Sequence, residues 1–156
     1  MSEISISILD CNFNDLETEF EKINSTDASF VHLDIMDGIF VSRDTRNTFD
    51  LEKIKTLSNK KLDIHLMIDK PIKYLQRYID LKPEYISVHL EKNSKLNECI
   101  NKIQSNKIKA GVAINPDTDI KFLEPYIKQV DMILIMSVFP GEGGQKFLSS
   151  TFEKIK

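Results

Sequence analysis

Short apolar runs alternate with longer amphipathic segments along this chain. Six runs have the length and residue content of strands: residues 4–9, 29–35, 62–67, 85–90, 109–114 and 131–137. Between them, apolar residues recur at helical spacing: Phe13, Leu16, Phe20 and Ile23; Leu51, Ile54 and Leu57; Ile72, Leu75 and Ile79; and Leu96, Ile100 and Ile103. A fifth helix is expected after residues 117–119. Strands that alternate with helices in this way predict a parallel sheet.

The alternation of residues within the strands predicts the kind of sheet. Residues two apart on a strand share a face, and one face of each predicted strand is aliphatic, as in Ile4, Ile6 and Ile8. The other face turns polar toward the carboxyl end of each strand, with Ser5 and Ser7; His32 and Asp34; Asp63, His65 and Met67; Ser87 and His89; and Gly111, Ala113 and Asn115. Polar groups that gather at this end are typical of the mouth of a barrel. We therefore predict an α/β fold, a TIM (β/α)8-type barrel in which residues 1–156 form a single, incomplete domain of about six β/α units.

Composition narrows the classes of partner. The chain has 21 Lys and Arg against 24 Asp and Glu, a formal net charge of -3, so we expect neither a nucleic-acid nor a membrane partner. It has no signal peptide pattern and no apolar run of about 18 residues. Cys11 and Cys99 lack the spacing of a disulfide framework or a zinc knuckle, which favours a cytoplasmic protein. A small-molecule partner is expected, and the expectation leaves room for a homo-oligomer.

All three histidines of the chain, His32, His65 and His89, fall on the polar face near strand ends. His32, Asp34 and His65 would offer two imidazoles and a carboxylate to one divalent metal ion. This mixed ligand set suits zinc, iron, manganese or cobalt better than magnesium. A carboxylate beside such an ion can act as a base toward a carbon acid next to a carbonyl. The alternative is a buried ion pair between Asp34 and a histidine.

Two further groups follow the strands. Met36, Met67 and Met136 end strands and would line the mouth, where thioethers exclude water, although core packing is the simpler role. Gly141, Glu142, Gly143 and Gly144 follow the sixth strand, and their backbone amides could approach an anion. An ordinary turn would also use such glycines. The Glu142 carboxylate would repel a phosphate unless it points to solvent.

Several motifs occur together: Ser7-Ile8-Leu9, HLDIMDG at 32–38, DIHLMI at 63–68, SVH at 87–89, AGVAINPDT at 110–118 and MSVFPGEGGQKF at 136–147. With them the chain resembles the ribulose-phosphate 3-epimerase family along essentially its whole length. The resemblance implies a metal-dependent isomerase of the pentose phosphate pathway and of carbohydrate metabolism. Its substrates would be phosphorylated ketoses, D-ribulose 5-phosphate and D-xylulose 5-phosphate, which exchange a proton at the third carbon.

The resemblance also implies roles for single residues. Asp34 would be the catalytic proton-transfer group and a metal ligand, together with His32 and His65. Ser7 and His65 would contact the substrate, and the loop of Gly141 to Gly144 would close over it near the phosphate.

The chain departs from the family pattern at Ile6, Ile39, Ser42-Arg43-Asp44, Phe139 and Glu142.

The motifs advance by about 26 residues per unit, so eight units would need about 208 residues. The family's second proton-transfer aspartate, on a seventh strand, would then lie beyond this chain, and we expect a fragment or truncated product with little epimerase turnover. Alternatives are an epimerase for a six-carbon ketose phosphate such as allulose 6-phosphate, and a non-catalytic remnant that pairs its open edges with a partner. A flavodoxin-like module fits less well, because residues 9–15 contain no glycine.

Overall fold

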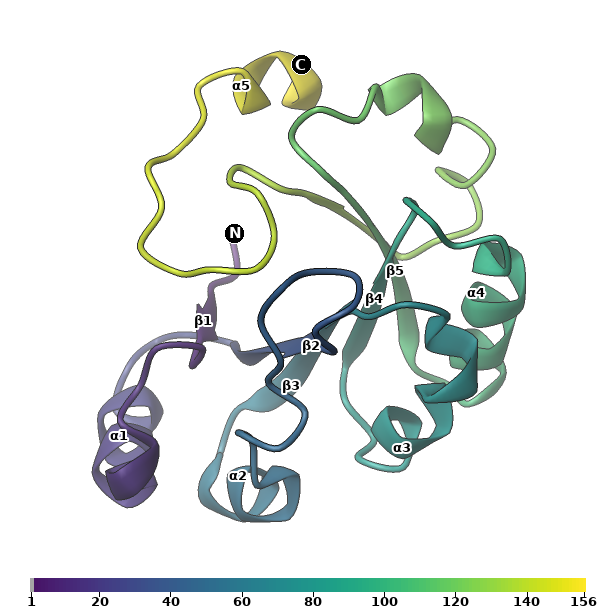
Figure 1. Ribbon diagram of the computed structural model, residues 1–156. Helices are drawn as coiled ribbons and strands as arrows, with labels where there is room; N and C mark the ends of the chain where they lie inside the picture. Colours follow the sequence, from purple (N-terminus) through teal and green to yellow (C-terminus); the bar gives the residue numbers. More distant parts are fainter. Residues whose placement is uncertain (1) are drawn as a thin grey trace.

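The computed structural model describes residues 2–156 and contains one sheet of six parallel strands. The strands follow one another in chain order: β1 (Ser5–Ser7), β2 (Phe30–Met36), β3 (Lys61–Met67), β4 (Tyr85–His89), β5 (Lys109–Ile114) and β6 (Met132–Ile135). The sheet curls into an arc with the helices along its outer side (Figure 1). This half-barrel confirms the predicted α/β architecture of TIM-barrel type.

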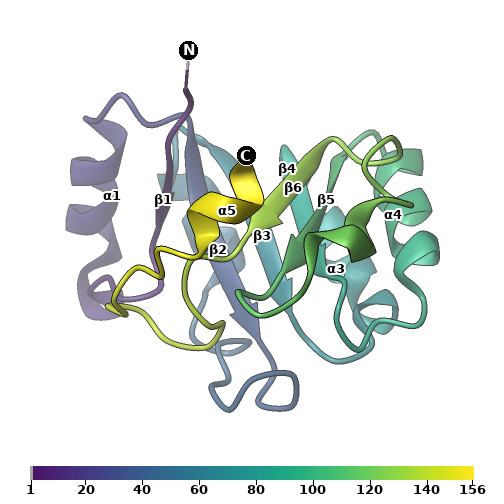
Figure 2. The ribbon, with the colours of Figure 1, turned by 90° about the horizontal axis from the view of Figure 1, so that it is seen from above.

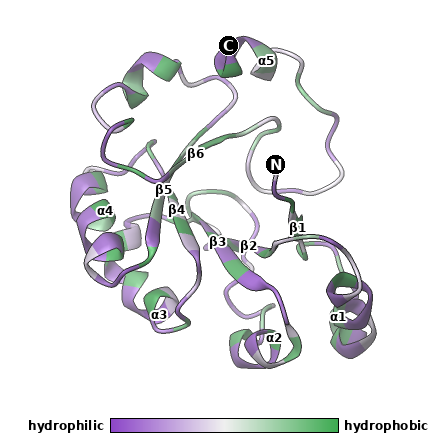
Figure 3. Cartoon of the chain, turned by 180° about the vertical axis from the view of Figure 1, so that it is seen from behind, coloured by the Kyte–Doolittle hydropathy of each residue, from purple (hydrophilic) through white to green (hydrophobic). Residues whose placement is uncertain are grey.

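The helices are short and cover the convex side of the sheet. They are η1 (Phe13–Asp15), α1 (Leu16–Asn24), α2 (Leu51–Leu57), η2 (Pro71–Lys73), α3 (Leu75–Ile79), α4 (Leu96–Ser105), η3 (Ile120–Leu123) and α5 (Thr151–Ile155), where η marks a 3-10 turn. Asp15 and Asp50 cap α1 and α2, since their side chains accept hydrogen bonds from Thr18 N and Lys53 N. Figure 3 shows hydrophobic and hydrophilic residues alternating along these helices, as amphipathic packing requires. No helix within residues 2–156 is long and apolar enough to cross a membrane.

The register of the strands confirms the predicted separation of the two faces. The aliphatic face lies under the helices, and Val31, Leu33, Ile64 and Ile86 are completely buried. Ile4 is the exception at 59% exposure, because it precedes β1, a short strand with a neighbour on one side only. The expected first strand over residues 4–9 is therefore too long.

The predicted fifth helix is reduced to one 3-10 turn, η3. Pro125 follows this turn, and it has no backbone N–H that could continue a helix. Lys154 of α5 reaches back to the end of β5, and its Nζ donates to Asn115 O at 3.1 Å. The segment from β6 to α5 crosses the open side of the arc (Figures 1 and 2).

Truncating a side chain in the core between the sheet and the helices should destabilise the protein, because it leaves a cavity. Ile64→Ala in β3 should lower the free energy of unfolding by about 2–5 kcal/mol, because it removes a fully buried side chain. Urea denaturation would measure the change. Ile127→Ala, at a residue 56% exposed, is the matched control and should change the free energy by less than about 0.5 kcal/mol. Equal losses in both variants would contradict this assignment of the core.

Candidate functional site

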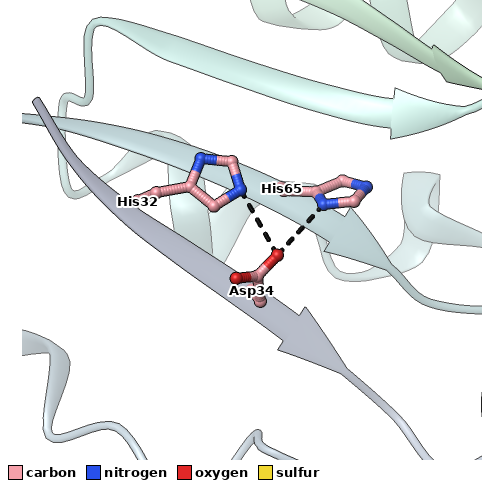
Figure 4. Close-up of side chains that lie close together, drawn as sticks. All are labelled: His32, Asp34 and His65. Carbon is pink, nitrogen blue, oxygen red and sulfur yellow. Dashed lines mark hydrogen bonds and ion pairs between the residues drawn. The ribbon is translucent and has the colours of Figure 1, made fainter. Parts of the chain in front are cut away.

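His32, Asp34 and His65 lie together at the centre of the concave face. The pairing of β2 with β3 places Asp34 opposite His65, and His32 lies two residues before Asp34 on the same face. Asp34 Oδ1 is 3.3 Å from His32 Nε2 and 3.2 Å from His65 Nδ1 (Figure 4). One atom from each residue lies within 4.8 Å of the others, and within residues 2–156 this is the one cluster of its kind.

The outward nitrogens of both rings are already engaged. His32 Nδ1 is 2.7 Å from Asp63 Oδ2, and His65 Nε2 is 2.9 Å from His89 Nε2. The inner contacts to Asp34 are longer, and two atoms bound to one ion at about 2.1 Å lie roughly 3.0–3.4 Å apart in octahedral to tetrahedral sites. Two imidazole nitrogens and a carboxylate oxygen at these separations can hold a divalent transition ion.

The charges of the cluster are set by burial and by hydrogen bonding. Burial opposes a charged His32, but its hydrogen bonds to Asp34 and Asp63 outweigh that cost and raise its pKa to about 10. Burial likewise opposes ionisation of Asp34, yet the His32 and His65 side chains next to its carboxylate hold its pKa far below the ordinary value. Burial dominates at His65 and lowers its pKa to about 4, so this ring is neutral near pH 7. The cluster therefore includes the buried ion pair between Asp34 and His32 that was the alternative to a metal site.

Glu91, which the sequence analysis missed, extends this network. His89 Nδ1 lies 2.9 Å from Glu91 Oε2, and Glu91 Oε1 accepts from Asn115 N at 2.8 Å and from Thr118 Oγ1. Burial raises the pKa of Glu91, but these hydrogen bonds outweigh it and lower the pKa to about 2. A carboxylate two residues beyond a strand-end histidine was the signal in the sequence.

A cavity of about 500 Å³ opens on the side of Asp34 that faces β1. Ser7, Asp34, Met36, Met67 and Met136 line it, so the structure brings these predicted site residues together. Ser7 Oγ donates to Asp34 Oδ2 at 2.7 Å. His65 is only 1% exposed and does not line the cavity, although it was expected to contact the substrate.

The glycine-rich loop forms another wall of this cavity. Gly141, Glu142, Gly143 and Gly144 all line it. Gly141 has a φ of +126° and packs against Val41, and a side chain at Gly143 would collide with the Asp10 carboxylate. The positive φ favours glycine at position 141, whereas the exposed Asp10 side chain could move away from a side chain at position 143. Glu142 is exposed to solvent at the rim.

The pKa values of His32 and His65 predict how stability depends on pH. Below pH 6.5 the unfolded chain protonates His65, whereas the folded chain does so only near pH 4, so stability falls on acidification. Above pH 6.5 folded His32 keeps a proton up to about pH 10 that the unfolded chain has lost, so stability falls again. Urea unfolding with a chelator present should give a maximum near pH 6.5. His65→Asn should flatten the limb between pH 6.5 and 4 and keep the alkaline limb, and an unchanged acid limb would contradict this view.

Comparison with known proteins gives one consistent family. The chain matches the Ribulose-phosphate 3 epimerase family over residues 3–156. It is 35% identical to the ribulose-phosphate 3-epimerase of Bacillus subtilis over 156 residues, 100% of this chain and 72% of that protein. It is 38% identical to the enzyme of that name from Synechocystis over 98% of this chain and 67% of that protein. It is 36% identical to the chloroplastic ribulose-5-phosphate-3-epimerase of Arabidopsis thaliana over 97% of this chain and 55% of that protein. The chain belongs to the ribulose-phosphate 3-epimerase family.

Proposed function

We propose that this chain acts on D-ribulose 5-phosphate and D-xylulose 5-phosphate, and that it transfers a proton at their third carbon. The observation that carries the proposal is the position of Asp34. Its Oδ2 meets Ser7 at the cavity wall, and its Oδ1 faces His32 and His65. The names of the relatives support this substrate pair rather than a six-carbon ketose phosphate. The family match does not favour the interpretation as a non-catalytic remnant.

His32 through Nε2, Asp34 through Oδ1 and His65 through Nδ1 would hold one zinc, iron, manganese or cobalt ion. The lengths of the inner contacts and the neutral state of His65 support this ligand set. A bound divalent ion would polarise the oxygens next to the third carbon and so make its hydrogen more acidic. His32 must give up its proton to become a ligand, so ion binding weakens as the pH falls.

Asp34 would take the proton from the third carbon of the ketose. The electron pair left on that carbon then spreads toward the neighbouring carbonyl oxygen, which gives an enediolate. The low pKa of Asp34 makes it a weak base, so it needs a carbon acid that the site has already acidified. Ser7 holds Oδ2 by its hydrogen bond and fixes the direction in which the carboxylate faces the cavity.

The other cavity residues would bind the substrate. Met36, Met67 and Met136 present thioethers that exclude water and donate no proton to the enediolate. The loop of residues 141–144 would meet the phosphate with its backbone N–H groups, which can approach closely because three of the four residues are glycines. The Glu142 side chain, exposed at the rim, is free to turn away from that phosphate.

The proposal extends to the pathway, the cellular location and the self-association of the protein. The reaction belongs to the pentose phosphate pathway, and the two free cysteines, Cys11 and Cys99, agree with a cytoplasmic location. Self-association into a homo-oligomer stays a prediction.

Metal binding gives the first test of the proposal. The chain should bind one equivalent of zinc or cobalt, and His65→Ala should weaken binding at least about 10-fold, because it removes one of three ligands. Titration calorimetry at pH 7 would measure both affinities. Asp80→Asn, at an exposed residue next to α3, is the control and should bind as the parent does. Parental affinity in His65→Ala would show that the ligand set is wrong.

Proton abstraction gives the second test. With zinc or cobalt present, the chain should exchange the hydrogen at the third carbon of ribulose 5-phosphate in deuterated water. Asp34→Asn should slow this exchange by about 10²–10⁴-fold, the usual contribution of a general base. Proton NMR follows the loss of the signal, and Asp80→Asn again serves as the control. If Asp34→Asn exchanges at the parental rate, another group is the base.

A further inference from the structure

The third histidine of the chain, His89, connects the candidate metal ligands to Glu91, a carboxylate outside the cluster. The rings of His65 and His89 have centroids 4.9 Å apart and planes inclined by 29°, and their Nε2 atoms are separated by 2.9 Å. Both side chains are almost completely buried, at 1% and 2% exposure. The other nitrogen of His89 contacts Glu91 Oε2 at 2.9 Å. Asp34, His65, His89 and Glu91 therefore form one continuous line of polar contacts.

The partners of Glu91 fix the direction of the last hydrogen bond in this line. Its Oε1 accepts from the backbone N–H of Asn115, a group that can only donate, and from Thr118 Oγ1. Its Oε2 must accept from His89, because an ionised carboxylate has no hydrogen to donate. The proton of His89 therefore lies on Nδ1. When His89 is neutral, its Nε2 presents a lone pair to His65.

We propose that Glu91 and His89 are positioning residues that keep His65 in the form able to bind a divalent ion through Nδ1. The inference rests on the metal site of the proposed function. A histidine that binds an ion through Nδ1 carries its proton on Nε2, and a buried N–H needs an acceptor. His89 Nε2 is that acceptor, and Glu91 makes it one by taking the other N–H of the ring.

His32, the other proposed ligand histidine, has a simpler arrangement than His65. His32 contacts the carboxylate of Asp63 directly, at 2.7 Å, as metal-binding histidines usually do. At His65 an imidazole stands between the ligand and its carboxylate. The carboxylate that serves His65 is therefore Glu91, which lies in the loop after β4 and not on β2 or β3. Glu91 also accepts a hydrogen bond from Asn115 N, just after β5.

Glu91→Gln tests this arrangement with almost no change in shape. The amide oxygen must face Asn115 N, so the amide nitrogen faces His89 Nδ1 and donates to it. His89 then carries its proton on Nε2, which opposes the Nε2–H that an ion-binding His65 needs. We expect the affinity for zinc to fall about 10–100-fold. The visible spectrum of the cobalt-loaded protein should also change, because the ligand set around the ion is disturbed.

Glu98→Gln is the matched control, since Glu98 is 58% exposed on α4 and lies outside the network. It should keep the parental zinc affinity and cobalt spectrum. Urea unfolding of the metal-free variants would show that Glu91→Gln still folds.

A pair of substitutions at His89 separates positioning from packing. His89→Gln places an amide oxygen near the position of Nε2 and can still accept from His65, whereas His89→Leu has a similar size and no acceptor. We expect His89→Gln to stay within a few fold of the parental zinc affinity and His89→Leu to lose about 10–100-fold. Equal affinities in these two variants, or parental affinity in Glu91→Gln, would overturn the inference and leave the metal site intact. A parent chain that binds no zinc would overturn the metal site itself, and the inference with it.

Discussion

The parallel pairing of β2 with β3 sets Asp34 beside His65, and the positions of the other polar groups follow from this register. The same register places His32 beside Asp63, so that His32 and His65 each have a carboxylate near one ring nitrogen. Because side chains alternate with a period of two, a slip of one residue would move Asp34 to the aliphatic face under the helices. The buried Leu33 and Ile35 on either side of Asp34 oppose that slip, since it would expose them on the polar face.

The concave face carries many ionisable side chains for a protein interior. Asp34, Asp63, His65 and His89 are all less than 10% exposed. Buried ionisable groups are costly unless they are paired, and here every one of them has a partner within hydrogen-bonding distance. Asp63 Oδ1 is the exception at the level of single atoms, because it is buried without a partner. A network of this kind restricts each side chain to one orientation, which is what a preorganised catalytic site requires.

Local pattern was enough to predict most of this architecture. The alternation of Val31, His32, Leu33 and Asp34 identified the two faces of β2 without any knowledge of its neighbours, and the cavity residues on strand ends followed from it. The fifth helix was expected because residues 117–119 are typical of a helix start, and it was wrong because Pro125 soon follows and the segment forms one 3-10 turn. Glu91 was missed for a different reason. It lies past the end of β4, and its contacts with Asn115 and Thr118 depend on how two loops meet, which no periodicity in the sequence encodes.

The cluster of His32, Asp34 and His65 and the neighbouring cavity differ in how far apart their residues lie in the sequence. Asp34 and His65 are 31 residues apart, on strands that follow each other directly. The cavity, by contrast, is closed only when Ser7 near the start of the chain meets Gly141 and Gly143 near its end. Closing a longer loop costs more conformational entropy, and domains made on the ribosome emerge from the amino terminus. The cluster of His32, Asp34 and His65 can therefore form while the chain is still being synthesised, whereas the cavity forms only after residues 141–143 have emerged.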